Sequence, residues 1–573
     1  MLTPEIHAEL TRWIQCANEK YQDELAALEK DDTAATDAFF QNLEFGTGGL
    51  RGILGAGPNR MNIHTVGKAT QGLANYLNAN FSNPSVAIAH DSRNCGLEFC
   101  QVAAGVLAAN GITSHLYERL EPTPALSWAV RDLHCSAGIC ITASHNPAEY
   151  NGYKAYGQDG CQITTQAAHD IQEAINNVDI FEDVKCMPFE EALERGLARW
   201  TDEAVLDRFV DAVYKQSLET PAALKDLSMV YTPLNGTGLE CVTRIFKRIG
   251  MEHVTVVPEQ AQPDGNFPTC PYPNPEIREA LERGLALCEQ VHPDLLLATD
   301  PDADRAGIAV AHNGEYVLLT GNEVGALLMD YLCTKAEERG EDLREKVCVS
   351  TIVSSVMCDL MAQERGFEMR RVLTGFKYIG EQIGMLEAAG QANRFLFGFE
   401  ESYGYLAGTH VRDKDAIVAS MLIVQAAAWH KAQGRTLVQA MEALYERYGW
   451  WKNSTLSVSF PGAAGADTMK SLMECLRSNA PTQIAGLNVT GVIDYATGVN
   501  MPVFGGCGTA SAPQKLPNAN VLEFQLEGGH KLIIRPSGTE PKVKAYTFVK
   551  GESEAQALQL LQQLEASAKE LLK

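Results

Sequence analysis

Short apolar runs, rich in β-branched and small residues, alternate with longer amphipathic segments through most of this 573-residue chain. This alternation predicts α/β units in which buried strands are covered by helices. The predicted strands occupy residues 86–90, 137–142, 228–232, 294–299 and 394–399. A typical domain has roughly 150 residues, so a chain of this length is expected to form about four domains.

The two ends of the chain depart from this pattern. Residues 1–43 are acidic and predicted to be helical, and a glycine-dense turn is expected to follow over residues 45–52. The last part of the chain combines closely spaced β-type runs with a final amphipathic helix, which predicts an α+β domain. Its predicted strands are residues 456–460, 521–526, 531–535 and 543–549. We therefore expect domains over residues 1–200, 201–319, 320–450 and 451–573.

The charge balance limits the partners that this chain can bind. Its 72 acidic and 47 basic residues give a formal charge of −25, which argues against nucleic acid and anionic membranes as partners. Glu5, Glu9 and Arg12 occupy the place where a signal peptide would be apolar, so we expect a cytosolic protein. The 15 cysteines include no Cys-x-x-Cys pair, which favours buried thiols over disulfides or zinc ligands.

Three aspartates stand at alternate positions directly after the predicted strand 294–299. Asp300, Asp302 and Asp304 would repel one another in one tight loop unless a cation lay between them. An EF-hand is excluded, because Arg305 and Ala311 replace its glycine and its final glutamate. An all-oxygen site with few protein ligands favours Mg²⁺.

A serine follows the predicted strand 137–142 in the sequence TASHNP. Ser144 is a candidate nucleophile, because a serine at a strand-to-loop junction can react if a base or a metal activates it. A polar turn is the more common explanation for an isolated serine. The GxSxG sequence is absent here, which disfavours an α/β-hydrolase.

A glycine-containing loop after the predicted strand 531–535 is a candidate phosphate clamp. In RPSGTEP, Arg535 offers a planar guanidinium, Ser537 and Thr539 offer hydroxyls, and Gly538 lets backbone amides approach an anion. Two further polar clusters are TGFK, with Thr374, Gly375 and Lys377, and FEES, with Glu400 and Ser402. Cationic residues therefore stand beside glycine-rich or metal-type motifs in several predicted domains, as expected for a phosphorylated polyol ligand: Arg51, Lys154, Arg305, Lys377, Lys414 and Arg535.

Six motifs, in this order, resemble the α-D-phosphohexomutase superfamily: FGTGGLR, TASHNP, DPDADR, TGFK, FEES and RPSGTEP. The resemblance spans residue 45 to beyond residue 541 and is strongest to the phospho-sugar mutase branch that contains the bacterial phosphoglucomutases. It implies an α/β fold of four domains around a central cleft, with three related α/β domains and a C-terminal α+β domain.

The resemblance also implies a reaction. Ser144 would carry a phosphoryl group and give it to glucose 1-phosphate, forming glucose 1,6-bisphosphate, which acts as intermediate and activator and then returns the other phosphate. Asp300, Asp302 and Asp304, with a phosphoserine oxygen, would hold Mg²⁺. Arg51, Lys154 and Arg305 would surround the reacting phosphate. Lys154, Lys414 and His145 are the candidates for general acid or base.

The other motifs would contact the substrate. By the resemblance, Glu400 and Ser402 read sugar hydroxyls, and Thr374, Gly375 and Lys377 position the sugar. The distal phosphate would be held by Arg535, Ser537, Gly538 and Thr539. Phe399 replaces the usual glycine of the sugar motif, which leaves phosphomannomutase and phosphopentomutase activity open beside phosphoglucomutase activity. A sugar-phosphate phosphatase and a catalytically silent sensor are alternatives of other classes, and the sequence does not fix the oligomeric state.

Overall fold

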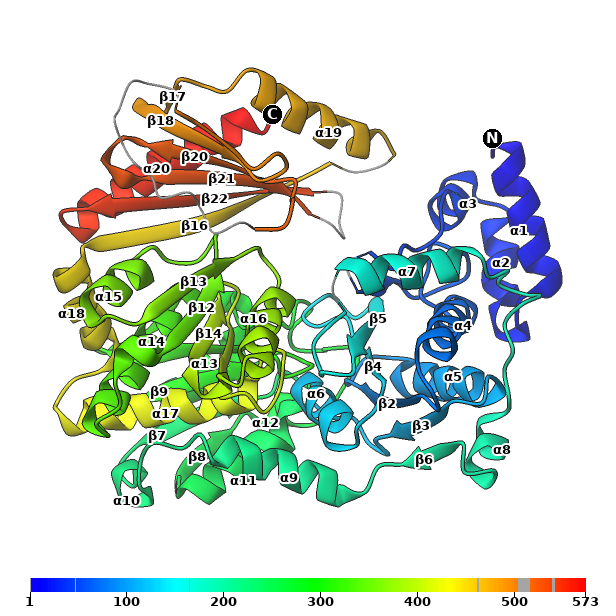
Figure 1. Cartoon of the computed structure of the whole chain (residues 1–573), viewed down its shortest axis with the longest axis horizontal. Coiled ribbons are helices and arrows are strands. Elements are labelled where there is room, and N and C mark those ends of the chain that lie inside the picture. The colour runs from blue at the N-terminus through cyan, green and yellow to red at the C-terminus, as the bar shows by residue number, and fades with distance from the viewer. Residues whose placement is uncertain (1, 47, 164, 461–462, 503–515, 538–541) are drawn as a thin grey trace. The chain divides into compact units, whose positions relative to one another are not determined.

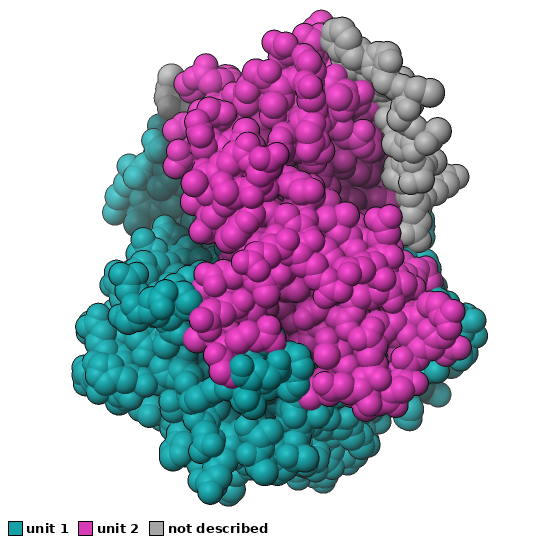
Figure 2. Space-filling view, turned by 90° about the vertical axis from the view of Figure 1, so that its left-hand side faces the viewer, with its two compact units in different colours: residues 1–320, 379–395, 402–433 teal, residues 321–378, 396–401, 434–573 magenta. Residues whose placement is uncertain are grey.

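The computed structural model describes residues 2–46, 48–163, 165–460, 463–502, 516–537 and 542–573. The chain forms two compact units, each assembled from more than one stretch of sequence (Figure 2). Unit 1 comprises Met1–Thr320, Ile379–Phe395 and Ser402–Gln433. Unit 2 comprises Gly321–Tyr378, Leu396–Glu401 and Gly434–Lys573.

Unit 1 begins with a helical segment followed by a six-stranded sheet of order β1-β5-β4-β2-β3-β6 (Figure 1). The strands are β1 (Gly49–Ile53), β2 (Ser85–His90), β3 (Thr113–Leu116), β4 (Ala137–Ile141), β5 (Tyr150–Gly157) and β6 (Ala198–Trp200). Strands β2, β3, β4 and β6 run parallel, and β5 pairs antiparallel with both β4 and β1. The helices that follow the first strand are α4 (Ile63–Asn80), α5 (Gly96–Ala109), α6 (Thr123–Asp132), α7 (Thr165–Asn176) and α8 (Phe189–Glu194).

Strand β1 corrects one prediction, because the glycine-dense stretch 45–52 is not a turn throughout. Residues from Gly49 onward form a strand that pairs with β5. A Cβ atom on Gly49 would lie 2.2 Å from the Tyr153 carbonyl oxygen, so this glycine permits a close backbone approach. Glycine density alone does not distinguish such an approach from a turn.

The second sheet of unit 1 has five strands in the order β11-β10-β9-β7-β8. They are β7 (Ser228–Thr232), β8 (His253–Val256), β9 (Leu295–Thr299), β10 (Ala306–His312) and β11 (Glu315–Leu319). Every residue of β9 is buried, as is every residue of β4, which explains why both read as continuous apolar runs. The accompanying elements are α9 (Glu203–Tyr214), α10 (Pro221–Leu224), α11 (Gly238–Ile249), α12 (Pro258–Ala261), α13 (Arg278–Val291), β15 (Gly404–Ala407) and α17 (Ala416–Ala432).

Unit 2 contains an α/β part and the C-terminal sheet. The α/β part has strands in the order β13-β12-β14, with β12 and β13 parallel. Its elements are α14 (Gly321–Glu338), β12 (Val347–Thr351), α15 (Met357–Arg365), β13 (Glu368–Val372), β14 (Phe395–Glu400) and α18 (Leu437–Tyr448). Helix α16 (Phe376–Ala388) begins in this unit, and its residues from Ile379 onward belong to unit 1.

The C-terminal sheet is antiparallel, with the order β16-β22-β21-β20-β18-β17 and with β19 paired to β18. Its elements are β16 (Trp450–Ser459), α19 (Ala463–Ser478), β17 (Gln483–Ile484), β18 (Leu487–Asp494), β19 (Val499–Pro502), β20 (Leu522–Leu526), β21 (Lys531–Pro536), β22 (Lys542–Gly551) and α20 (Glu554–Leu571). A tight turn joins β20 to β21, where Gly528 has a φ of +81°. Ile533 and Tyr546 of this sheet pack against Ile352 and Leu373, so the sheet and the α/β part share an apolar core within unit 2.

Residues 1–43 form short helices, as predicted, and these helices pack around Trp13. They are α1 (Pro4–Cys16), α2 (Gln22–Leu28) and α3 (Asp32–Phe39). The Trp13 ring is buried and lies 5.5 Å from the ring of His64, the second residue of α4. His64 Nε2 accepts a hydrogen bond of 2.9 Å from the Asn18 backbone N–H, which requires a ring that is unprotonated at this nitrogen.

We expect this N-terminal segment to loosen in acid. Burial lowers the pKa of His64 to about 4, from 6.5 in the unfolded chain. The stability that the neutral ring contributes is therefore complete above pH 6.5 and is lost as the pH falls toward 4. Limited proteolysis of the segment should be roughly tenfold faster at about pH 5 than at about pH 7.5, beyond the protease's own pH dependence. His64→Gln retains an acceptor but cannot titrate there, so equal pH dependence in this variant would contradict the prediction.

No helix within the parts of the chain that the structure describes is long and apolar enough to span a membrane. The cysteines that the structure describes are all free thiols, and most of them are buried. The four exposed cysteines are Cys16, Cys95, Cys186 and Cys475.

Candidate functional site

Ser144 lies in the loop that joins the fully buried strand β4 to β5. Its backbone is left-handed, with a φ of +53°, and its N–H donates to Thr142 Oγ1 at 2.8 Å. Its Oγ donates to Asp300 Oδ2 at 2.9 Å and lies 3.2 Å from His145 Nδ1. A non-glycine residue in this conformation is uncommon and costs free energy, so the loop is held in an unusual shape that places the hydroxyl beside a carboxylate.

Asp300, Asp302 and Asp304 follow the buried strand β9 and form one cluster of oxygen ligands. One carboxylate oxygen from each lies within 4.8 Å of the others, and all three side chains are buried. Asp300 Oδ1 accepts hydrogen bonds from the backbone amides of Asp304 and Arg305. Oδ1 of Asp302 and Oδ1 of Asp304 are buried and have no hydrogen-bond partner among the described residues. Buried oxygens without partners are costly, and a divalent cation would satisfy them.

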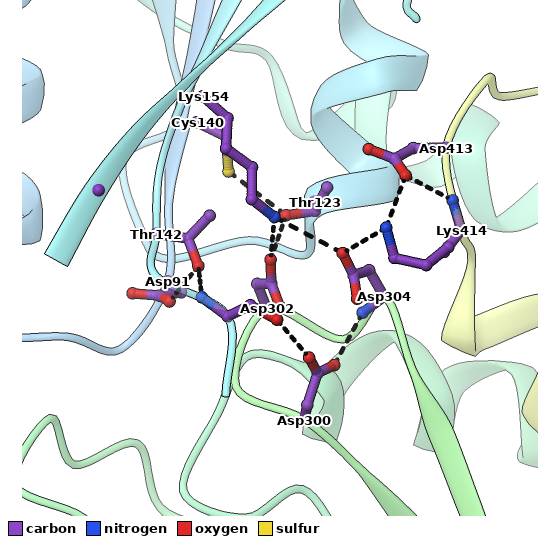
Figure 3. Close-up of polar contacts among 12 residues, drawn as sticks. Asp91, Thr123, Cys140, Thr142, Lys154, Asp300, Asp302, Asp304, Asp413 and Lys414 are labelled. Carbon is purple, nitrogen blue, oxygen red and sulfur yellow. Dashed lines mark hydrogen bonds and ion pairs between the residues drawn. The ribbon is translucent and has the colours of Figure 1, made fainter. Parts of the chain in front are cut away.

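Two lysines partly neutralise this cluster (Figure 3). Lys154 Nζ lies 2.8 Å from Asp302 Oδ2 and 3.6 Å from Asp304 Oδ2. Lys414 Nζ lies 3.1 Å from Asp304 Oδ2 and 3.0 Å from Asp413 Oδ1. Burial opposes ionisation of both partners, yet Asp302 and Asp304 raise the pKa of Lys154, and Lys154 lowers the pKa of Asp302.

Asp300 shows that the two lysines do not compensate the whole cluster. Burial, followed by the charges of Asp302 and Asp304, raises the pKa of Asp300 well above its ordinary value. Further positive charge beside Asp300 would favour its ionised form. The three oxygen donors and their electrostatics fit a bound divalent cation, as the sequence predicted.

The predicted arginines of unit 1 lie beside the same loops. The antiparallel register pairs Arg51 with Gly152 and Gly49 with Lys154, so the side chains of Arg51 and Lys154 project from one face of the sheet. Arg51 also donates to Asn146 Oδ1 at 3.1 Å, in the Ser144 loop. Arg305 donates to Glu276 at 2.7 Å, and its Nε lies 3.6 Å from Asp304 Oδ1.

Unit 2 holds a second group of predicted residues. Glu400, at the end of β14, accepts a hydrogen bond of 2.7 Å from the backbone N–H of Gly375, whose φ is +121°. The TGFK loop and the FEES segment therefore meet at this point. Lys377 is buried, and its Nζ lies 5.2 Å from the centre of the Tyr378 ring. Thr374 Oγ1 is buried and makes no hydrogen bond to any residue that the structure describes.

Arg535 is the last residue but one of strand β21 in the same unit, and its positive charge interacts with Glu401. Within the described parts of the chain its buried Nε has no hydrogen-bond partner. The backbone N–H of Ser537 donates to the Lys542 carbonyl at 2.7 Å. Gly538 and Thr539 lie outside the described residues, and Ser402 belongs to unit 1.

Comparison with known proteins decides the family. Models of the phosphoglucomutase/phosphomannomutase α/β/α domains I, II and III match residues 42–180, 207–314 and 320–448. A phosphoglucomutase of Staphylococcus aureus (strain bovine RF122 / ET3-1) is 35% identical over 543 residues, which cover 94% of this chain and 95% of that protein. The chain belongs to the phosphoglucomutase/phosphomannomutase family.

Solved structures share the fold of this family member. A phosphoglucomutase/phosphomannomutase family protein of Burkholderia thailandensis has a TM-score of 0.65 at 17% identity, covering 92% of this chain and 97% of that one. The open form of the phosphoglucomutase parafusin of Paramecium has a TM-score of 0.67 at 18% identity, with 93% and 95% covered. The prediction of three α/β domains and a C-terminal α+β domain is confirmed, whereas the exact domain boundaries and the cytosolic location stay predictions.

Two buried residues that contact the predicted lysines and aspartates of this family member were not among the predicted site residues. Asp413 is buried and binds both Lys414 Nζ and the Tyr156 hydroxyl, which lies 2.8 Å from its Oδ2. Thr123 donates its backbone N–H to the Asp302 carbonyl and its hydroxyl to Asp302 Oδ2, each at 2.9 Å. Asp413 is the neighbour of the predicted Lys414 in the sequence, and this position could have indicated that it belongs to the same site. Thr123 begins a helix after a proline, and nothing in that pattern indicates contact with a loop 179 residues away.

Proposed function

We propose that the protein is a phosphoglucomutase that interconverts glucose 1-phosphate and glucose 6-phosphate through a phosphoryl group carried on Ser144. The observation that carries the proposal is the 2.9 Å hydrogen bond between Ser144 Oγ and Asp300, which belongs to a cluster of three carboxylates that could hold a cation. The Staphylococcus aureus relative, a phosphoglucomutase aligned over nearly its whole length, supports glucose phosphates as substrates.

The cation is proposed to be Mg²⁺, held by Asp300, Asp302, Asp304 and an oxygen of phosphorylated Ser144. Carboxylate oxygens without nitrogen or sulfur ligands favour this hard ion, which commonly keeps phosphate in its coordination shell. When bound, Mg²⁺ would offset the negative charge that spreads over the phosphoryl oxygens during transfer. Arg51, Lys154 and Arg305 would supply the remaining positive charge around the same phosphate.

The phosphoryl transfer needs no reactant besides the sugar phosphate and phosphorylated Ser144. A sugar hydroxyl attacks the phosphorus of phosphorylated Ser144, the bond from phosphorus to Ser144 Oγ breaks, and glucose 1,6-bisphosphate forms. The bisphosphate then returns its other phosphoryl group to Ser144 Oγ. The proton of the attacking hydroxyl requires an acceptor, for which Lys154, Lys414 and His145 are the candidates. His145 Nδ1, at 3.2 Å, is also placed to receive the Ser144 proton when this serine is phosphorylated again.

The residues of unit 2 are proposed to hold the part of the substrate that does not react. Glu400 and Ser402 would contact sugar hydroxyls, with Thr374, Gly375 and Lys377 positioning the ring. The distal phosphate would be bound by Arg535, Ser537, Gly538 and Thr539. The unpartnered polar atoms Thr374 Oγ1 and Arg535 Nε support ligand binding in this unit, because buried polar groups are normally satisfied.

A substrate panel tests the proposal most directly. Hexose, hexosamine and pentose 1-phosphates would each be assayed with Mg²⁺ and a catalytic amount of the matching bisphosphate. We expect the highest kcat/KM with glucose 1-phosphate. A higher value with mannose or pentose phosphates would instead identify a phosphomannomutase or a phosphopentomutase. Release of inorganic phosphate without isomerisation would identify a phosphatase.

Arg535→Ala should raise the KM for both glucose 1-phosphate and glucose 6-phosphate about ten- to a hundredfold. Each isomer presents its spare phosphate to this residue, and a charge-assisted bidentate contact is worth roughly 1.5 to 3 kcal/mol. Some loss of kcat should accompany the change, because binding energy at the remote phosphate also orients the reacting end. Steady-state kinetics in both directions would measure the effect.

Two controls accompany this variant. Arg477→Ala removes a guanidinium that binds Asp494 in the same C-terminal domain and should leave both KM values near those of the wild type. Phosphorylation of Ser144, measured by intact mass, should persist in Arg535→Ala. Unchanged KM values for both isomers, or loss of the phosphoserine, would show that this loop does not hold the distal phosphate.

A further inference from the structure

One buried guanidinium donates hydrogen bonds to several backbone carbonyls in and beside the Ser144 loop. Arg93 follows strand β2, and its side chain is completely buried. Its NH1 donates to the carbonyls of Pro147 at 2.7 Å and Tyr150 at 2.9 Å. Its NH2 donates to the carbonyl of Ser144 at 2.7 Å and also to that of Asn146. Four carbonyl groups of one loop therefore point at a single cation.

The guanidinium is itself fixed from two other directions. Its Nε lies 3.4 Å from Asp91 Oδ2, and its Cζ lies 5.1 Å from the ring centre of the buried Phe267. Asp91 also accepts a hydrogen bond of 2.5 Å from Thr142 Oγ1, which in turn accepts the N–H of Ser144 at 2.8 Å. Figure 3 shows this contact between Thr142 and Asp91. The carbonyl and the N–H of Ser144 are therefore both tied, directly or through Thr142, to the Arg93–Asp91 pair.

This arrangement acts on a left-handed backbone conformation in the site. Ser144 has a φ of +53°, which a serine does not adopt without support from its surroundings. We infer that Arg93 is a positioning residue, whose guanidinium holds the loop in the left-handed conformation that directs Ser144 Oγ at Asp300. The inference rests on the proposed function of Ser144 as phosphoryl carrier, since only that role makes its direction matter to the reaction rate.

A stabilising role for the core of the domain does not explain the distribution of these contacts. All four carbonyls belong to residues 144–150, and none belongs to the helices that cover the sheet. Lysine cannot replace this arginine, because one ammonium group lacks the planar set of donors that spans several carbonyls. An experiment can therefore separate the effect of the positive charge at position 93 from the effect of the hydrogen bonds that position the Ser144 loop.

Arg93→Lys keeps the positive charge and removes the planar set of guanidinium donors. In the full-length protein we expect kcat to fall about ten- to a hundredfold, since a misplacement of about 1 Å at a reacting group has an effect of this size. The KM for glucose 1-phosphate should change less than about threefold, because substrate binding does not depend on the direction of Ser144 Oγ. Arg365→Lys is the matched control. That arginine is also largely buried and bonded to a carbonyl and a carboxylate, those of Asp330, and its variant should retain wild-type kcat.

Hydrogen exchange provides a readout that does not depend on activity. Amides of residues 143–151 should exchange at least about tenfold faster in Arg93→Lys than in the wild type, and Arg365→Lys should leave them unchanged. Unchanged exchange in Arg93→Lys would overturn the inference, whatever happens to kcat. Faster exchange with an unchanged kcat would also overturn it, because the loop would then not need its conformation for the reaction. If the wild type itself fails to isomerise glucose phosphates, the proposed function fails, while the exchange result still decides whether Arg93 holds the loop.

A second variant keeps the test decisive if Arg93→Lys does not fold. Thr142→Val preserves the shape of the side chain and removes the hydroxyl that links the Ser144 N–H to Asp91. It should lower kcat and accelerate exchange of the same segment in the same direction as Arg93→Lys. Wild-type kcat together with wild-type exchange in a folded Thr142→Val protein would contradict the positioning role.

Discussion

Ser144→Ala is expected to abolish isomerisation of glucose phosphates, with a loss of kcat of at least about 10³-fold, while the fold stays intact. The substitution removes only Oγ and therefore its contacts to Asp300 and His145. The N–H bond to Thr142 and the carbonyl bond to Arg93 do not involve the side chain, so the loop keeps its main supports. Without Oγ the phosphoryl group has no atom to which it can be transferred.

Two measurements separate this loss from a general defect. Intact-mass analysis after incubation with glucose 1,6-bisphosphate should show a phosphorylated fraction of the wild type and none of the variant. Ser420→Ala is a matched control, because Ser420 is also buried and its hydroxyl donates to the Ala416 carbonyl within helix α17, away from the candidate site. It should retain turnover and phosphorylation. Substantial isomerisation by Ser144→Ala would rule out transfer through this serine.

Local sequence signals predicted the most apolar strands of this chain and the candidate loops that follow them. The continuous apolar runs became the buried strands β4 and β9, because a strand covered on both faces is apolar at every position. Polar clusters directly after such strands were sound candidates for ligand groups, since these strand ends are where open α/β sheets bind ligands. Ser144 and Asp300, which lie in the loops after two different strands, accordingly lie within hydrogen-bond distance.

Contacts between distant segments could not be predicted in the same way. Arg93 is one of many arginines that follow a strand, and only the fold shows that four carbonyls near Ser144 surround it. Strand β1 was missed because its glycines allow a close backbone approach as well as a turn. Both cases depend on tertiary packing, which a local pattern does not contain.

The two units also divide the predicted site residues by chemistry. Unit 1 holds Ser144, the three aspartates, Lys154 and Lys414, which the proposed function gives to the phosphate that reacts, and it also holds Ser402. Unit 2 holds the Glu400–Gly375 contact and Arg535, which the proposed function gives to the sugar and to the spare phosphate. Variants in unit 1 should therefore act mainly on kcat, and variants in unit 2 should act on KM as well. This contrast distinguishes a mutase from a simple phosphate-binding protein.

Asp302→Asn should lower kcat about 10²- to 10³-fold and weaken Mg²⁺ binding far more than it weakens binding of glucose 1-phosphate. The substitution keeps the shape of the side chain and removes one negative charge from a buried cluster. The activation free energy should rise by several kcal/mol when a metal no longer offsets the charge of the reacting phosphate. Lys154 would also lose the charge of its nearest carboxylate, which lies 2.8 Å away in the wild type, and would keep only the more distant one of Asp304 among the three aspartates.

The measurement combines kinetics with direct detection of the metal. Mn²⁺ can substitute for Mg²⁺ as a spectroscopic probe, and its affinity for the purified protein should fall in Asp302→Asn. Asp211→Asn, which changes an exposed carboxylate paired with Arg248, should alter neither metal affinity nor kcat. Removing the metal from the wild type with EDTA should reproduce the loss of kcat, and added Mg²⁺ should reverse it. Full activity in chelated buffer would show that the aspartate cluster does not serve as a metal site, because its unpaired buried oxygens would then be satisfied in another way.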